Sequence, residues 1–94
     1  MLTETEFLVE TGISPEKFQD IIALGWVETY TEADNLKLYS DTDIYRVRKL
    51  VRICSDFELP IIGGTIIVDL LDRIASLENE VSALKAQIEG GGAS

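Results

Sequence analysis

The sequence predicts a mainly α-helical fold with a small β-wing and a long C-terminal coiled-coil helix. Three patterns support this prediction: two short amphipathic helical segments near the N-terminus, β-prone runs before a third helix, and an apolar repeat over the last third. A chain of 94 residues with 46% hydrophobic content is one small globular unit with a modest core. We expect a compact N-terminal part followed by one extended helix.

The first helix is expected to open at Thr3 or Thr5 and to run through Val9, with Gly12 ending it. Its expected buried residues are Phe7 and Leu8.

The second helix has start and stop signals at both ends. Ser14 is a suitable N-cap, Pro15 suits the first helical position, and Gly25 suits a left-handed stop. An apolar face recurs every three residues and is expected to pack on the first helix as in a helix-turn-helix: Phe18, Ile21 and Leu24. The residues expected to face solvent are Glu16, Gln19 and Asp20.

Two β-prone runs follow, Trp26–Tyr30 and Leu36–Tyr39, separated by the polar turn Thr31–Asn35. They predict a small β-wing. Trp26 has two interpretations, a core residue that joins the wing to the helices or an anchor that binds a partner. The first is the more frequent in proteins, and the sequence leaves both open.

A third helix is expected after Ser40, which forms a capping-box pattern with Asp43. One side of this helix is apolar: Ile44, Val47, Leu50 or Val51, Cys54 and Phe57. The other side is basic: Arg46, Arg48, Lys49 and Arg52. We expect the basic residues to pair with the acidic N-terminal segment or with a dimer mate. A grip on a DNA backbone is the alternative.

The last helix is expected from Pro60 to Glu89 and carries a heptad seam without a fault: Ile67, Leu70, Ile74, Leu77, Val81, Leu84 and Ile88. Alternating β-branched and leucine positions favour two strands, so we expect a homodimer. A parallel pair joins Arg73 to Glu78 and Glu80 to Lys85, whereas an antiparallel pair joins Arg73 to Glu80, so the orientation stays open. The alternative is a helix that folds back on its own domain.

The expected organisation is therefore a winged helix-turn-helix domain at 1–59, a dimerising coiled-coil helix at 60–89 and a flexible tail at 90–94. Gly63 and Gly64 weaken the start of the long helix, because glycine costs about 1 kcal/mol against alanine in a helix. A kink or a later start is expected there.

Charge restricts the classes of partner. The net charge is −9, from 17 acidic and 8 basic residues, which disfavours phosphate polymers and anionic membranes and favours a basic protein. Cys54 is the single cysteine, no signal-peptide pattern is present, and the apolar stretch Ile61–Leu71 is short and interrupted by Asp69. We expect a cytoplasmic protein that does not enter a membrane.

Catalytic sites are not indicated. Glu6 and Glu10 lie four residues apart on one helical face, but exposed glutamate pairs are common. The chain has no histidine to activate Cys54, and Gly63-Gly64 does not follow a strand as a phosphate loop does. We expect no enzyme activity, no metal and no cofactor.

Four strings carry a family resemblance: TEFLVETGIS at 5–14, LGWVE at 24–28, DTDIYRVRKLVRICSDFEL at 41–59 and LLDRIASLENEVSALKAQI at 70–88. In this order and spacing the chain resembles the MerR-like winged helix-turn-helix family, and within it the CbpM family of bacterial chaperone-modulatory proteins. The resemblance implies a non-catalytic modulator that binds and inhibits the J-domain of a DnaJ/CbpA-type co-chaperone.

The charge of the N-terminal segment agrees with a protein partner. Residues 1–36 hold eight acidic residues against Lys17 alone, a net charge of −7, whereas affinity for DNA comes largely from cations. J-domains of the kind that the resemblance implies carry a basic helix. The expected partner-binding residues are Glu10, Glu16, Gln19, Asp20 and Trp26. The alternatives are a merely solvated acidic face and a MerR-like DNA-binding transcriptional regulator that uses the arginines of the third helix.

Overall fold

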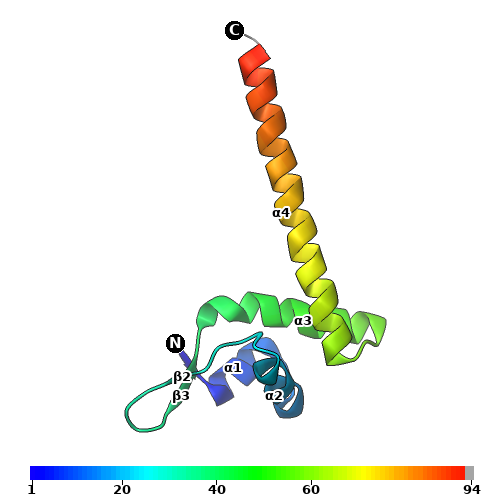
Figure 1. Ribbon diagram of the computed structural model, residues 1–94. Helices are drawn as coiled ribbons and strands as arrows, with labels where there is room; N and C mark the ends of the chain where they lie inside the picture. The colour runs from blue at the N-terminus through cyan, green and yellow to red at the C-terminus, as the bar shows by residue number, and fades with distance from the viewer. Residues whose placement is uncertain (93–94) are drawn as a thin grey trace.

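The structure is a computed structural model and describes residues 1–92 (Figure 1). The elements in chain order are β1 (Leu2–Thr3), α1 (Glu4–Thr11), α2 (Pro15–Ala23), β2 (Tyr30–Thr31), β3 (Lys37–Tyr39), a 3-10 turn η1 (Asp41–Asp43), α3 (Ile44–Phe57) and α4 (Ile61–Gly92). This order confirms the predicted mainly α-helical fold with a small β-wing and a long C-terminal helix. The molecule measures 61 × 36 × 20 Å, because α4 projects from the domain that the other elements form.

α1 begins at a reciprocal capping box. The hydroxyl of Thr3 accepts from the Glu6 N–H at 3.3 Å, and the Glu6 carboxylate accepts from the Thr3 N–H at 3.1 Å. Gly12, with a φ of 74°, ends the helix and donates to the Leu8 carbonyl. The predicted opening at Thr3 is confirmed, and the helix runs two residues beyond the predicted Val9. Phe7 is buried as predicted, while Leu8 is half-buried.

α2 has the predicted caps, but one of its predicted core residues is wrong. Ser14 accepts from the Lys17 N–H, and Gly25 adopts a φ of 73° just past the helix. Phe18 and Ile21 are buried, whereas Leu24 is 49% exposed. A three-residue spacing drifts about 60° round an α-helix at each step, so the third residue of the row has left the core-facing side.

The wing starts later than its sequence predicts. Tyr30 pairs with Leu38 and Thr31 with Lys37 in antiparallel register, and β1, which the sequence did not predict, pairs with the other edge of β3. The predicted strand Trp26–Tyr30 is therefore wrong over most of its length. The physical reason is packing: Val27 is buried in the core and Trp26 lies against α3 and α4, so this part of the chain is held by side chains and has no strand partner.

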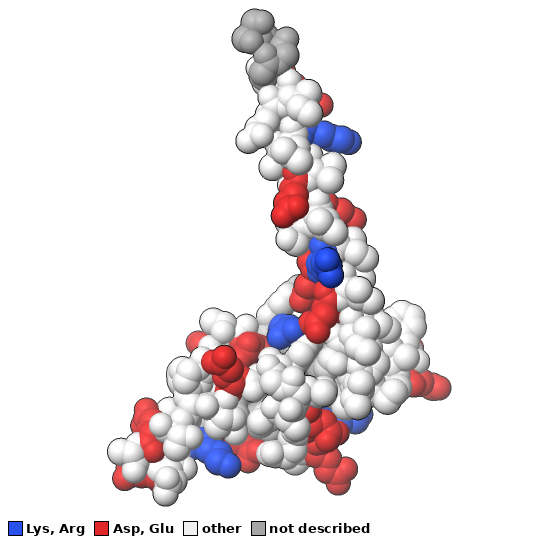
Figure 2. Space-filling view, viewed as in Figure 1, with Lys and Arg blue, Asp and Glu red and all other residues white. Residues whose placement is uncertain are grey.

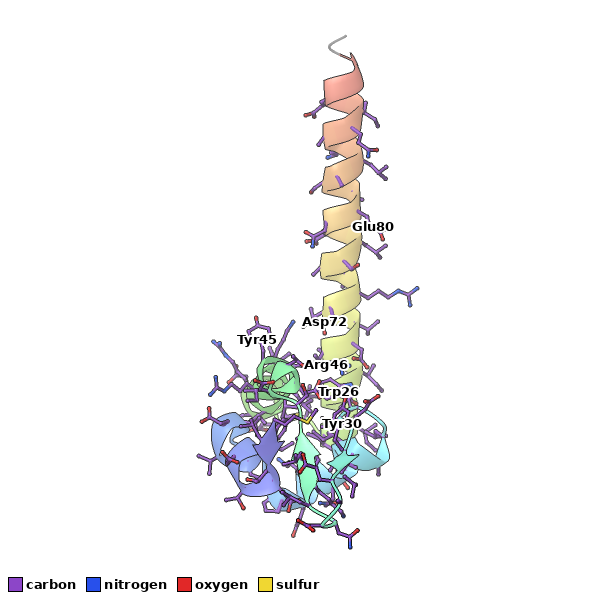
Figure 3. The ribbon with its side chains drawn as sticks, turned by 90° about the vertical axis from the view of Figure 1, so that its left-hand side faces the viewer. Trp26, Tyr30, Tyr45, Arg46, Asp72 and Glu80 are labelled. Atoms are coloured by element: carbon purple, nitrogen blue, oxygen red, sulfur yellow. The ribbon has the colours of Figure 1, made fainter. Side chains whose placement is uncertain are left out.

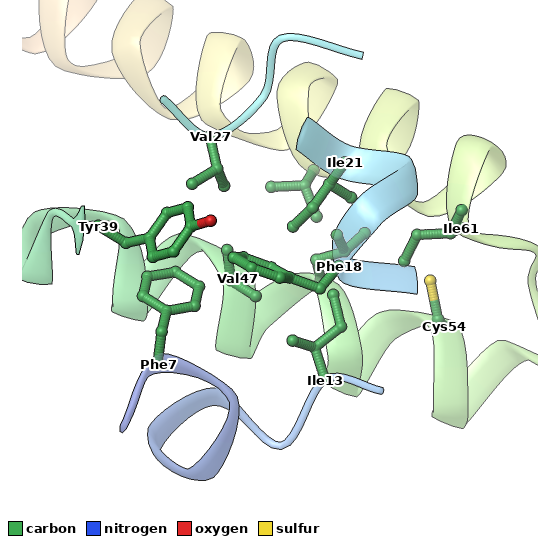
Figure 4. Packing of buried hydrophobic residues seen from close by; sticks show 11 residues of the cluster. Phe7, Ile13, Phe18, Ile21, Val27, Tyr39, Val47, Cys54 and Ile61 are labelled. Carbon is green, nitrogen blue, oxygen red and sulfur yellow. The ribbon is translucent and has the colours of Figure 1, made fainter. Parts of the chain in front are cut away.

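Aromatic rings occupy the centre of the core (Figure 4). Phe7, Phe18 and Tyr39 come from three different elements and lie with ring centroids 4.9 to 5.8 Å apart, a spacing at which aromatic pairs attract. Aliphatic residues from α2, α3, α4 and the connecting segments close around them: Ile13, Ile21, Val27, Val47, Leu50, Ile61 and Val68. The wing, the helix-turn-helix and the base of α4 therefore share one core.

α3 follows η1, at which Ser40 accepts from the Thr42 N–H. Asp43 does not complete the predicted capping box, because it makes no side-chain capping bond. Val47, Leu50 and Cys54 are buried as predicted, but Phe57 is 70% exposed. α3 ends at Phe57, and Glu58, in a left-handed conformation, redirects the chain. Leu59, rather than Phe57, packs against the core.

α4 starts at Ile61, without the delay that its glycines suggest. A Cβ atom on Gly64 would lie 2.8 Å from Leu50 Cδ1 and closer still to Cys54 Sγ, so only glycine allows α4 to cross α3 this closely. The helix then runs away from the domain rather than folding back on it (Figure 1). It continues through Gly92, beyond the predicted end at Glu89, so 90–92 of the predicted flexible tail are helical and 93–94 lie outside the described residues.

Candidate protein-binding interface

The acidic surface comprises Glu4, Glu16, Gln19 and Asp20, which are all exposed. The last three project from the outer side of α2, opposite its buried Phe18 and Ile21. The Gln19 amide donates to the Glu4 carboxylate at 3.1 Å, which joins the outer sides of α1 and α2. The structure thus brings together three of the predicted binding residues, Glu16, Gln19 and Asp20, on one face. In Figure 2 acidic side chains outnumber basic ones over the domain.

Glu10 lies at the end of α1, beside α3. Arg48 donates from Nε to the Glu10 carbonyl at 2.6 Å and from its guanidinium to the Glu10 carboxylate at 3.2 Å. Both side chains are about half exposed, so this ion pair adds little to stability. It does pair the negative charge of Glu10 with a cation, whereas Glu16 and Asp20 form no salt bridge with another side chain in residues 1–92.

Trp26 is half-buried at the junction of α3 and α4 (Figure 3). The Arg46 guanidinium lies 3.7 Å from the centre of the Trp26 indole ring, a cation–π contact. The indole Nε1–H of Trp26 donates to the Asp69 carboxylate at 3.2 Å. Arg46 also donates to the Trp26 carbonyl and pairs with Asp69, while Lys49 pairs with Asp72 at 3.1 Å. We call Trp26, Arg46, Lys49, Asp69 and Asp72 the α3–α4 junction.

The basic side of α3 is paired within the chain. Arg48 pairs with Glu10 of the acidic segment, as predicted, but Arg46 and Lys49 pair with α4, which the sequence did not indicate. Arg52 pairs weakly with Asp56, four residues along its own helix. Asp69 and Asp72 had one signal in the sequence: they lie three residues apart on the side of the helix away from the heptad seam.

The heptad seam of α4 is uncovered in the single chain. Leu70, Ile74, Leu77, Val81 and Leu84 are 50 to 57% exposed, and Ile88 is 73% exposed. Ile67, nearest the domain, is half-buried. Ile74, Leu77 and Val81 line a shallow apolar hollow. An apolar row of this length on one side of a helix is typical of a surface that another helix covers.

The candidate metal ligands and the single cysteine lie in the part of the chain that the structure describes, residues 1–92. No group of three acidic, cysteine or histidine side chains is placed to hold a metal ion in this part of the chain. Burial raises the pKa of the Cys54 thiol, which disfavours the reactive thiolate. Among the same residues, no helix is both long enough and apolar enough to cross a membrane.

Comparison with known proteins agrees with this architecture. Residues 2–86 match the family model described as "MerR HTH family regulatory protein". The chain is 31% identical over 86 residues to proteins named "Chaperone modulatory protein CbpM" from Escherichia coli O1:K1, Escherichia coli strain K12 / DH10B and Shigella boydii serotype 18. The matched region covers 92% of this chain and 85% of each relative.

Proposed function

The chain belongs to the CbpM family of chaperone modulatory proteins, with the helix-turn-helix fold of MerR-type regulators, and we propose that it binds and inhibits a J-domain. The J-domain is that of a DnaJ/CbpA-type co-chaperone. The protein acts in the cytoplasm by binding alone, as a non-catalytic modulator, without a cofactor. The acidic surface is its binding site.

The observation that carries this proposal is the charge of the outer side of α2. In a helix-turn-helix that reads DNA, this helix enters the major groove and contacts it through cations and amides. Here it presents Glu16 and Asp20, and neither carboxylate forms a salt bridge with another side chain in residues 1–92. These charges repel phosphate and attract a basic protein surface.

Inhibition follows from occupancy. A J-domain docks on its Hsp70 partner through a basic helix, and a protein that covers this helix excludes Hsp70 from it. Opposite charge on the two surfaces speeds their encounter and fixes their orientation. Because Glu10 is paired with Arg48 and Trp26 is held in the α3–α4 junction, we assign Glu16, Gln19 and Asp20 the larger share of the contact.

Self-association through the heptad seam completes the proposal. The apolar residues from Leu70 to Ile88 stay about half exposed or more in the single chain, and a second copy supplies the same row. An α4–α4 pair would bury this surface by packing β-branched and leucine residues in alternating layers. The active form is therefore proposed as a homodimer that presents two acidic surfaces.

DNA binding is the second candidate, favoured by the family model for MerR-type regulators. Its cations would be Arg46, Arg48, Lys49 and Arg52, but all four are paired with acidic residues of this chain. A gel shift with genomic fragments at low salt separates the two functions. A DNA-binding regulator binds some fragment far better than bulk DNA, whereas the proposed modulator binds none selectively.

The proposal is tested by calorimetric titration with the isolated J-domain of a co-chaperone from the same organism, at two salt concentrations. We expect saturable binding that weakens with salt, and a large loss of affinity in the double variant Glu16→Lys, Asp20→Lys. The matched control is Glu32→Lys, Asp34→Lys, which changes the net charge equally on the exposed loop of the wing. If both double variants behave alike, the acidic surface is not the binding site.

A further inference from the structure

An apolar hollow adjoins the acidic surface. It is lined by Asp20, Ala23 and Leu24 of the α2 end and by Ile62 of α4. Leu24, at the C-cap of α2, is 49% exposed, and Ile62, in the first turn of α4, is 57% exposed, although both are large apolar residues. Exposed apolar residues that lie together beside a charged surface are typical of a protein-binding site.

The two walls of the hollow are fixed by the fold. On one side Gly25, in a left-handed conformation, follows Leu24, the C-cap of α2, and the Trp26 N–H donates to the Ile21 carbonyl at 2.9 Å. On the other side Ile61 enters the core and Gly64 holds α4 close to α3, which leaves Ile62 pointing out. A hollow whose walls are held by hydrogen bonds and core packing needs little rearrangement to receive a ligand.

The hollow is not part of the heptad seam. At about 100° per residue, Ile62 lies about 80° round α4 from Leu70 and about 140° from Ile67. A partner helix that packs along the seam therefore lies beside Ile62 without covering it. Leu24 is at the end of another helix, so it can make a different contact. Ile66, by contrast, lies about 40° from Leu70 and flanks the seam.

The hollow is continuous with the acidic surface. Glu16, Asp20 and Leu24 follow each other at four-residue spacing, so they form one row along α2 of about 12 Å. Asp20 belongs both to the row and to the rim of the hollow. A ligand that reaches the apolar end of this row therefore passes two carboxylates that have no salt bridge to another side chain in residues 1–92.

We propose that the hollow receives an apolar side chain that projects from the basic helix of the J-domain, so that the binding site is an acidic row ending in an apolar anchor. The inference rests on the proposed function and names the chemistry of the partner at that site: cations opposite Glu16 and Asp20, and a large apolar residue opposite Leu24 and Ile62. Most of the binding energy of an interface commonly comes from such a desolvated anchor, while charges set the encounter. A second copy of this chain fits less well, since its charge is −9.

The test uses Leu24→Asn and Ile62→Asn as separate variants of the full chain, titrated with the J-domain at two salt concentrations. Each is expected to weaken binding about tenfold or more and to leave the salt dependence as it is in the wild type. The matched control is Leu36→Asn, because Leu36 is 47% exposed on the wing loop and lies outside the hollow. Ile62→Leu, which keeps the apolar surface, is expected to retain binding.

The outcomes separate the inference from the proposed function. If the wild type does not bind the J-domain, the proposed function is wrong and the inference falls with it. If the wild type binds and the hollow variants bind equally well, the inference alone is overturned. If sedimentation equilibrium shows weaker self-association of these variants with unchanged J-domain affinity, the hollow is a contact between copies and the inference is likewise overturned.

Discussion

The two ends of α4 carry similar apolar residues in opposite situations. At its base Ile61 and Val68 are enclosed by the domain, being 8% and 0% exposed. Farther along, Leu77 and Leu84 are 51% and 57% exposed although they belong to the same uninterrupted helix. An apolar repeat therefore predicts a helix and which of its sides is apolar, but whether the chain itself covers that side depends on what lies next to it.

The boundary between these two regions is the α3–α4 junction. Asp69 follows Val68 directly and Asp72 lies about one turn beyond it, and the two join α4 to Trp26, Arg46 and Lys49 of the domain. Beyond Asp72, the residues of the seam are exposed to solvent in the single chain. The base of α4 is therefore a core element of a small domain, and the outer part is the surface that we propose for a second copy.

The largest effect is expected from a charge in the seam. Leu77→Asp places a carboxylate from each copy inside the proposed dimer interface, where an unpaired charge is strongly unfavourable. We expect self-association to weaken by a factor of roughly 1,000 or more, measured by sedimentation equilibrium. Asn79→Asp, on the opposite side of the same helix, is the control. Self-association that survives Leu77→Asp contradicts the assignment of the seam.

The shared core of the domain is expected to be strongly destabilised by Phe18→Ala. Phe18 is fully buried between Phe7 and Tyr39, so its loss leaves a cavity in the shared core. We expect a loss of about 3–5 kcal/mol in the free energy of unfolding, measured with urea at a fixed protein concentration. Tyr45→Ala, at a residue 78% exposed, is expected to change it by less than about 0.5 kcal/mol. Equal effects of both variants would contradict the described core.

The base of α4 is tested by a glycine pair. Gly64→Ala brings a methyl group into contact with Leu50 and Cys54 and is expected to destabilise the protein by about 1–3 kcal/mol. The neighbouring Gly63→Ala meets only Pro60 at 3.7 Å and is expected to be neutral or to stabilise the helix by up to about 1 kcal/mol. Thermal unfolding of both variants decides the matter. If Gly64→Ala is also neutral, α4 does not cross α3 as closely as described.

The junction between the two regions makes a smaller contribution. Arg46 and Asp69 are 35% and 52% exposed, so solvent screens their attraction, and the ring of Trp26 adds a cation–π contact. A double-mutant cycle with Arg46→Gln and Asp69→Asn is expected to give a coupling of about 1 kcal/mol that falls at high salt. The same cycle on Arg52 and Asp56 is the control, with a coupling near zero. A coupling no stronger than that of this control would contradict the contacts described at the junction.

The smallest effect is expected at the N-terminus of α1. The Thr3 N–H, and then its hydroxyl, donate to the Glu6 carboxylate and lower the pKa of Glu6 below its ordinary value of 4.5. Because the folded-state pKa is lowered, the resulting stability is present above the ordinary pKa and is lost as pH falls through the folded-state value. Melting curves are expected to show that Glu6→Gln destabilises slightly at pH 7 and less below pH 4. An advantage of the wild type that persists unchanged at low pH would contradict this.

The sequence predicted those features that depend on near neighbours in the chain. Thr3, Ser14 and Gly12 act at the helix ends where local capping rules place them, because a cap satisfies backbone groups within four residues. Phe7, Phe18 and Val47 are buried as predicted. Among the predicted partner-binding residues, Glu16, Gln19 and Asp20 share one exposed face as expected from their spacing.

Other features depend on which distant segment each side of a helix contacts, and these arise only from tertiary packing. Leu24 and Phe57 follow the periodic pattern and are nevertheless exposed, because each lies at a helix end where the chain turns away from the core. In the sequence, Asp69 interrupts an apolar stretch. In the structure its carboxylate accepts hydrogen bonds from Trp26 and Arg46, which precede it by 43 and 23 residues. Local sequence specifies which side of a helix is apolar or charged. Only the packing of distant segments determines whether that side becomes core, junction or binding surface.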